Sequence, residues 1–172
     1  MKNNWFQKIS RYQRAIAVIV FLSFLCVGSI SVAALINHMD IPTFVASWST
    51  KQVTASQLQQ WQLKSVIFVD VRSPDEYAED HIGDSRLIPL SDIEAGFGSK
   101  QIAALVQTNQ QPTIVLYCHS GQRSIKAYKR LENMGVNFVV LQGGITAWRK
   151  VVPKSQDTRV LNPITWKSAV LR

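Results

Sequence analysis

A run of 22 residues with no charged side chain and no proline, residues 15–36, constrains this chain more than any other part of its sequence. At a rise of about 1.5 Å per residue, a helix of this length crosses a bilayer core about 30 Å thick. A buried helix of a small soluble domain rarely stays apolar on every side over such a length. We therefore predict one transmembrane helix over residues 15–36.

A cleavable signal peptide is the alternative for the same residues. Basic residues precede the apolar run, and Ser31-Val32-Ala33 supplies the small side chains that a signal peptidase requires. The apolar part of a signal peptide is usually about 7–15 residues, shorter than this run. We favour an uncleaved anchor, and secretion after cleavage near Ala33 is the alternative.

The positive charge of the chain lies at its two ends. Residues 1–14 form a basic flank with a net charge of +4, residues 51–148 hold nine basic and nine acidic side chains, and residues 149–172 have a net charge of +5. A nucleic-acid-binding domain carries its positive charge across a folded face. The distribution therefore argues against a nucleic-acid partner, despite the overall charge of +8.

The same flank predicts how the segment is oriented. Four basic residues precede the apolar run, whereas the 15 or so residues after it contain only Asp40 and Lys51 as charged residues. Short flanks rich in lysine and arginine remain in the cytoplasm. We expect a single-pass protein of bacterial source with a cytoplasmic N-terminus and residues 37–172 outside the cytoplasm, in the periplasm of a Gram-negative cell.

The remainder of the chain has the pattern of an α/β domain. Three apolar, β-branched runs, at 65–69, 113–117 and 138–141, are typical of buried parallel strands. Helix-start signals lie between them, with Thr54 and Ser73 as the N-caps. Strands alternating with helices predict a mainly parallel sheet flanked by helices. The predicted parts are a linker at 37–53, the domain at 54–150 and a basic, solvated tail at 151–172.

The loop that follows the second strand contains the residues best suited to chemistry. Cys118 lies between a strand and a helix, where backbone N–H groups favour a thiolate and a bound anion. Gly121 permits a tight turn, and Arg123 adds a fixed positive charge. A cysteine after an apolar strand is more often an inert core residue, but the glycine and arginine in the same turn favour a nucleophile.

Three segments, in one order along residues 51–150, resemble the motifs of rhodanese domains, the single-domain sulfurtransferases. No single motif is specific, but the three together are. They are Asp70-Val71-Arg72-Ser73-Pro74-Asp75-Glu76-Tyr77 with His81-Ile82 and Ile88-Pro89-Leu90, the loop Cys118-x-x-Gly121-x-Arg123-Ser124, and Gly143-Gly144-Ile145-Thr146-Ala147-Trp148.

The resemblance implies an open, mainly parallel sheet and a sulfur transfer in two steps. Cys118 takes the outer sulfur of a small anionic donor such as thiosulfate as a persulfide, and a thiol or cyanide acceptor removes it. Asp70 and Arg72 would support the site, with Asp70 orienting the loop or capping the next turn. No metal or organic cofactor is needed. The residues expected to bind the donor are His119, Ser120, Gly121, Gln122, Arg123 and Ser124.

Two other functions fit parts of the pattern. Phosphatases with this fold use a Cys-x5-Arg loop, one residue longer than the Cys118-x4-Arg123 spacing here, so a phosphatase is the weaker alternative. A non-catalytic interaction module is the other, although the cysteine and arginine are both present.

His119 stands where many family members have arginine, and Asp80 and Asp84 replace two glycines of the first motif. His119 replaces a fixed charge by one that titrates, which would weaken binding of anionic donors.

Four further side chains have structural interpretations. We expect Arg72 and Glu76 to form a local ion pair, His81 to make hydrogen bonds within the fold, and Trp148 to be a core anchor.

Overall fold

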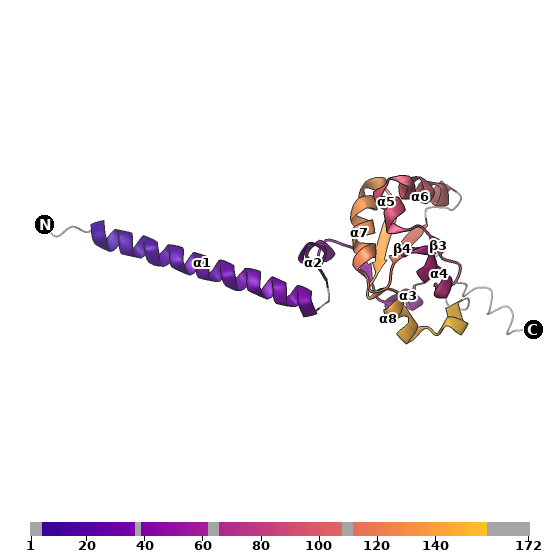
Figure 1. The fold of residues 1–172 in the computed structure, drawn as a ribbon, viewed down its shortest axis with the longest axis horizontal. Helices are drawn as coiled ribbons and strands as arrows, with labels where there is room; N and C mark the ends of the chain where they lie inside the picture. The colour runs from indigo at the N-terminus through magenta and orange to yellow at the C-terminus, as the bar shows by residue number, and fades with distance from the viewer. Residues whose placement is uncertain (1–4, 37–38, 62–65, 108–111, 158–172) are drawn as a thin grey trace, which may run out of the picture. The chain divides into compact units, whose positions relative to one another are not determined.

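The computed structural model describes residues 5–36, 39–61, 66–107 and 112–157. The chain divides into two compact units, Met1–Val45 and Ala46–Arg172 (Figure 1). The first consists mainly of one long helix, and the second holds a sheet flanked by helices.

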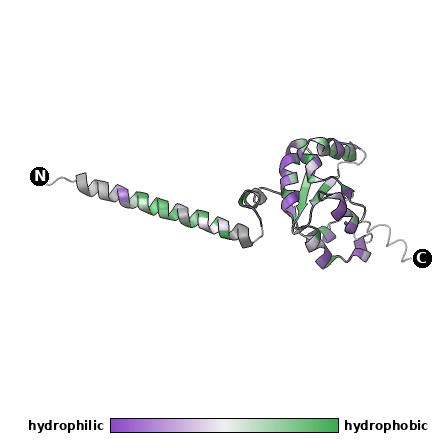
Figure 2. Ribbon diagram, viewed as in Figure 1, coloured by the Kyte–Doolittle hydropathy of each residue, from purple (hydrophilic) through white to green (hydrophobic). Residues whose placement is uncertain are grey.

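Helix α1, Trp5–Ile36, is continuous through the apolar run and begins ten residues before the predicted span. Its window Ala15–Val32 is long and apolar enough to cross a membrane, a property shared by transmembrane spans and signal sequences. Hydrophobic residues dominate this part of the helix (Figure 2). Serine hydroxyls within it donate to carbonyl oxygens of the preceding turn, which satisfies them without water. These pairs are Ser23 with Val20, Ser29 with Cys26 and Ser31 with Val27.

The second unit contains a five-stranded sheet in the order β1-β5-β4-β2-β3. All neighbouring strands are parallel, which confirms the predicted sheet type. Every residue of the central strand β4 is buried, as expected for a strand covered on both faces. The strands are β1 (Gln52–Val53), β2 (Val66–Asp70), β3 (Arg86–Leu87), β4 (Thr113–Tyr117) and β5 (Asn137–Leu141).

Helices lie on both faces of this sheet (Figure 1). Thr54 and Ser73 are the N-caps of α3 and α4, as the sequence predicted, and both form complete capping boxes. Gly135, at φ 70°, follows the short 3-10 turn that ends α7. The helices are α2 (Ile41–Ser47), α3 (Ala55–Gln60), α4 (Pro74–Glu79), α5 (Leu90–Glu94), α6 (Phe97–Gln107), α7 (Gln122–Leu131) and α8 (Gly144–Val151), with 3-10 turns η1 (Glu132–Met134) and η2 (Lys154–Gln156).

Two segments carry more structure than the sequence predicted. The expected linker contains α2 and β1, and β1 adds an edge strand beside β5. At the other end, residues 152–157 were expected to be solvated, but Val152 and Asp157 are buried against the domain. The rest of the predicted tail, 158–172, lies outside the described residues.

Trp148 of α8 anchors the core between α8 and the sheet. It is fully buried, and its ring meets that of Phe68 edge to face at 5.5 Å between centroids. Its indole Nε1–H donates to Asp157 at 3.0 Å. This confirms the predicted core role and explains why the chain after α8 folds back.

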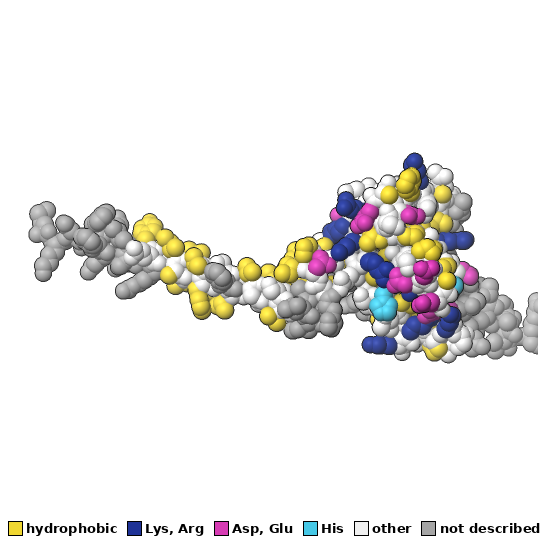
Figure 3. Space-filling view, in the orientation of Figure 1, with side chains coloured by type: hydrophobic (Ala, Val, Ile, Leu, Met, Phe, Trp, Pro, Cys, Tyr) yellow, Lys and Arg dark blue, Asp and Glu magenta, His cyan; other side chains and the backbone are white. Residues whose placement is uncertain are grey.

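Asp157 also belongs to a charged cluster with Arg149 and Asp80. The Arg149 guanidinium donates to both carboxylates, at 2.7 Å to Asp157 and 2.8 Å to Asp80. The hydrogen bond from Arg149 holds the pKa of Asp80 below its usual range. Asp80, which replaces a motif glycine, therefore ties α4 to α8. Acidic and basic side chains are interspersed on this unit (Figure 3).

We predict that Asp157→Ala lowers the free energy of unfolding by about 2 kcal/mol, because the Trp148 indole N–H and one side of Arg149 lose their buried acceptor. Glu94→Ala is the matched control, since Glu94 is exposed at the end of α5. It should change the free energy of unfolding by less than about 0.5 kcal/mol. Urea denaturation of the full chain in detergent measures both, and equal midpoints for the two variants would contradict the anchoring role.

Candidate active site

Cys118 lies directly after β4, at the carboxyl edge of the sheet. Its side chain is buried, and its Sγ accepts a hydrogen bond from the Gly121 N–H at 3.1 Å. The Ser124 hydroxyl lies 3.7 Å from the same sulfur and donates to the Gly121 carbonyl at 2.8 Å. Gly121 has a φ of 110°, a backbone conformation that favours glycine. The turn thus folds back over the sulfur and presents a backbone donor to it.

Helix α8 holds this loop from behind. The N–H groups of Ile145 and Thr146 donate to the carbonyls of Cys118 and His119, at 2.8 and 3.2 Å. In a trans peptide the N–H points opposite to the carbonyl, so the N–H groups of His119 and Ser120 face away from α8. A Cβ at Gly144 would overlap both loop carbonyls, so only glycine allows this approach. The third sequence motif therefore orients the amides of the second.

Arg123, in the first turn of α7, forms a bidentate ion pair with Glu76 of α4. The two N···O distances are 2.6 and 2.7 Å. The hydrogen bond from Arg123 lowers the pKa of Glu76 to about 2, and the same hydrogen bond raises the pKa of Arg123. The expected pair between Arg72 and Glu76 is therefore wrong, because Glu76 is paired across the site with the arginine of the loop.

Arg72 is paired with Asp70 at the end of β2. Its Nη2 donates to the Asp70 carboxylate at 2.7 Å and also to the Asp80 carbonyl. Asp70 also accepts the Arg72 backbone N–H at 2.9 Å, as a residue that caps a turn does. Both side chains are buried, so this pair fixes the start of α4 beside the loop.

The other residues predicted for the site lie at its rim. His119 and Ser120 are exposed, and the His119 ring nitrogen is 3.5 Å from the Thr146 hydroxyl. Gln122 is half-buried at the start of α7. Of the predicted site residues, the structure thus brings Gly121, Arg123 and Ser124 together at the Cys118 sulfur. His81 is outside this group; it stacks on Tyr77 and contacts the Tyr77 carbonyl at 3.0 Å, which agrees with its structural interpretation.

Sequence reasoning did not assign Glu76 and Gly144 to this site. Glu76 was assigned the wrong partner because Arg72 is near it in sequence, whereas Arg123 is 47 residues away. Gly144 was seen only as part of a motif. Its signal is the doubled glycine directly after a strand, which indicates a close backbone approach.

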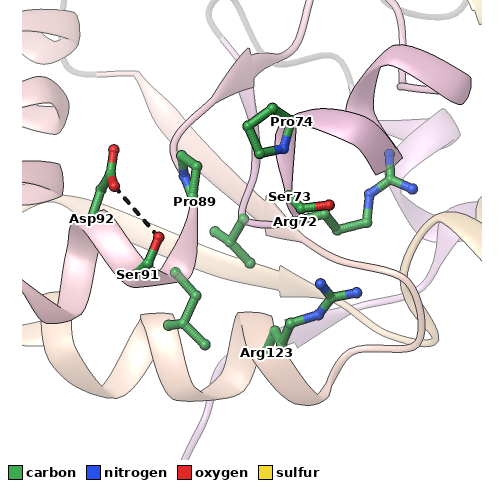
Figure 4. A pocket seen from close by; sticks show the side chains of 9 residues that line it. Arg72, Ser73, Pro74, Pro89, Ser91, Asp92 and Arg123 are labelled. Atoms are coloured by element: carbon green, nitrogen blue, oxygen red, sulfur yellow. Dashed lines mark hydrogen bonds between the residues drawn. The ribbon is translucent and has the colours of Figure 1, made fainter.

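A groove of about 440 Å³ adjoins the loop (Figure 4). Arg123 belongs to both the loop region and the groove. Within the described residues no group of three or more His, Cys, Asp or Glu side chains is placed to hold a metal ion. The groove is lined by Val71, Arg72, Ser73, Pro74, Pro89, Leu90, Ser91, Asp92 and Arg123.

Comparisons with known proteins indicate one family. Residues 54–151 match the family model for the rhodanese-like domain. Over 101 residues the chain is 38% identical to the probable adenylyltransferase/sulfurtransferase MoeZ of Mycobacterium tuberculosis, covering 57% of this chain but 24% of that protein. It is 30% identical over 78 residues to the thiosulfate sulfurtransferase PspE of Escherichia coli, covering 45% and 69%.

Solved structures include a rhodanese-like domain protein from Staphylococcus aureus. That structure is 29% identical, with a TM-score of 0.46, and the match covers 58% of this chain and 91% of that one. The family match spans more than half of the chain and contains the sheet from β2 to β5, the cysteine loop and α8. The chain therefore belongs to the family of proteins with a rhodanese-like domain.

Proposed function

We propose that this protein is a sulfurtransferase in which Cys118 carries a sulfane sulfur between a donor and an acceptor. The observation that carries the proposal is the position of the Cys118 sulfur, 3.1 Å from the backbone N–H of Gly121, the N-cap of α7. Such donors stabilise negative charge on a thiolate and on a persulfide that replaces it. Relatives named as sulfurtransferases support the same reaction class.

With thiosulfate as donor, the Cys118 thiolate attacks the outer sulfur. A new S–S bond forms at Cys118, the S–S bond of the donor breaks, and sulfite leaves with the electron pair. A thiol or cyanide acceptor then attacks the outer sulfur of the persulfide and restores the thiolate. The loop amides at 119–123 hold the charge of the persulfide, and Arg123 helps to hold the anionic donor.

The alternatives differ in what they require of the loop. A phosphatase needs a cradle for a tetrahedral phosphoryl group, and the Cys118-x4-Arg123 loop is one residue shorter than the phosphatase loop. A non-catalytic module needs neither the cysteine nor the backbone donor at its sulfur. The contact between Gly121 N–H and Cys118 therefore favours catalysis.

Incubation of the full chain with thiosulfate should add the mass of one sulfur atom to Cys118, and cyanide should remove it as thiocyanate. Cys118→Ser should abolish both steps. Cys26→Ser should retain them, because Cys26 lies in α1 and is remote from the loop in sequence. Intact-protein mass spectrometry checks this. A cysteine that takes up no sulfur from any donor would favour the interaction module, and phosphatase activity without sulfur uptake would favour the phosphatase.

The ion pair between Arg123 and Glu76 should make the domain sensitive to acid. The pKa of Glu76 is lowered from 4.5 to about 2 by its hydrogen bond with Arg123, so the pair stabilises the folded state above pH 4.5. That stabilisation is lost as the pH falls from 4.5 toward 2. We predict that Glu76→Gln has a lower melting temperature than the wild type at pH 6. Between pH 4.5 and 3 the melting temperature of this variant should fall less than that of the wild type.

Glu79→Gln is the control for this prediction, because Glu79 is exposed on the same helix. Thermal unfolding of both variants at several pH values supplies the comparison. If Glu76→Gln and the wild type lose the same stability on acidification, the pair does not account for it.

We also propose that α1 is an uncleaved anchor, with the N-terminus in the cytoplasm and the rhodanese-like domain outside it. The support is the asymmetry of charge around the apolar run 15–36, which contains no charged residue. The donor and acceptor would then be met outside the cytoplasm. Cleavage near Ala33 would place the domain on the same side but release it.

A reporter enzyme that is active only outside the cytoplasm, fused after Arg172, should be active and membrane-bound. Replacing the four basic residues of 1–14 by glutamine should reduce that activity, because the topology signal is removed. A fusion that is active outside but soluble indicates cleavage. A reporter that is active only in the cytoplasm contradicts the orientation.

A further inference from the structure

The groove of Figure 4 begins beside the residue that precedes Cys118. The Val71 N–H donates to the carbonyl of Tyr117 at 3.0 Å, and the Leu90 N–H donates to the carbonyl of Val71 at 3.1 Å. The groove lining thus connects the strand that presents Cys118 with the start of α5. Because Arg123 borders it on the other side, a molecule in the groove lies next to the sulfur loop.

The groove lining is apolar in its middle and charged at its ends. Figure 4 shows Asp92 and Ser91 at one end and Arg123 at the other. The side chains without charge or hydroxyl are Val71, Pro74, Pro89 and Leu90. A short aliphatic stem would fit against them, because burial of each methylene group is favourable.

The two arginines of the groove each have a carboxylate partner. Arg72 is paired with Asp70 at 2.7 Å, and Arg123 is paired with Glu76 at 2.6 Å. Asp92 differs from them. In the described part of the chain no lysine or arginine lies within salt-bridge distance of its carboxylate, which accepts a hydrogen bond from the Ser91 hydroxyl at 3.4 Å. The uncompensated charge of the lining is therefore negative.

The negative charge of Asp92 is unexpected next to a loop whose backbone N–H groups favour anions. A dianion such as thiosulfate gains nothing from Asp92, whereas a cation would be attracted to it over a few ångströms. The half-buried position of Asp92 makes its field stronger than that of a fully exposed carboxylate. The groove is thus complementary to a positively charged group joined to a short apolar stem.

We propose that this groove binds the sulfur acceptor, and that the acceptor is an amino thiol whose ammonium group pairs with Asp92. The inference rests on the proposed sulfur transfer. The aliphatic stem lies along Pro89 and Leu90, and the thiol end points toward Arg123, where the groove adjoins the loop. Asp92 is then the residue that selects the acceptor by charge, while the loop amides hold the sulfur.

The transfer itself balances without a further reactant. The acceptor thiolate attacks the outer sulfur of the Cys118 persulfide, and a new S–S bond forms on the acceptor. The S–S bond at Cys118 breaks, and its electron pair returns to Cys118 as the thiolate. The acceptor leaves as a persulfide, with the same total charge on both sides of the reaction.

Three thiols that differ in one group test the charge preference: cysteamine, 2-mercaptoethanol and 2-mercaptoethanesulfonate are cationic, neutral and anionic. The full chain is first loaded with sulfur at Cys118, and its loss to each thiol is followed by mass spectrometry. The ratio of second-order rate constants for cysteamine and 2-mercaptoethanol should fall about fivefold in Asp92→Asn, the size expected for one partly exposed ion pair. Comparing ratios between variants cancels the different reactivities of the thiols.

Glu94→Gln is the matched control, because Glu94 lies on the same helix, is exposed and does not line the groove. Its ratio should equal that of the wild type. Asp92→Lys should shift the preference toward 2-mercaptoethanesulfonate, which a folding defect would not do. Equal ratios in the wild type and both Asp92 variants would overturn the proposal while leaving the sulfurtransferase reaction intact.

A chain that cannot be loaded at Cys118 would contradict the proposed reaction instead. The groove is then tested by binding, through NMR shifts of the amides of residues 90–93 on titration with cysteamine and with 2-mercaptoethanol. Larger shifts with cysteamine, reduced in Asp92→Asn, support the groove as a cation site. The absence of shifts with cysteamine overturns it.

Discussion

The site depends on two hydrogen bonds from the first turn of α8 to the loop carbonyls of Cys118 and His119. They point those carbonyls toward α8, so the amides that follow them point away from α8. The bonds require a backbone approach that no side chain at Gly144 would allow. A motif more than 20 residues downstream of the cysteine therefore determines the direction of the loop amides, and burial of Trp148 holds α8 in place for this purpose.

Pairs of opposite charge hold the rest of the site. Asp70 with Arg72 fixes the end of β2, Glu76 with Arg123 joins α4 to α7, and a third pair joins Asp80 to Arg149. The second and third pairs join segments far apart in sequence, whereas the first acts within one turn. The cost is that both arginines nearest the loop share their charge with a carboxylate, which weakens the field that either one offers to a free anion.

The sequence predicted the elements whose signals are local. The capping boxes at Thr54 and Ser73 and the apolar runs of β2, β4 and β5 need only neighbouring residues. It missed β1, since two residues are too few to show alternation. It also mispaired Glu76, because Arg72 is near in sequence and only the tertiary fold brings Arg123 within 2.6 Å. Likewise, nothing next to Asp157 in sequence indicates that Trp148 needs its carboxylate. The roles of the loop residues in binding a donor stay predictions.

These constraints divide recognition in the proposed reaction between backbone and side chains. Backbone amides bind an anion by its size and charge, so a loop of amides accepts several sulfur donors with little discrimination. Because the arginines are paired, selectivity falls to the side chains at the rim of the site, which are the carboxylate of Asp92 and the exposed ring of His119. An imidazole ring and a carboxylate offer less to an anionic donor than two free arginines would. The site is thus better suited to choosing its acceptor than its donor.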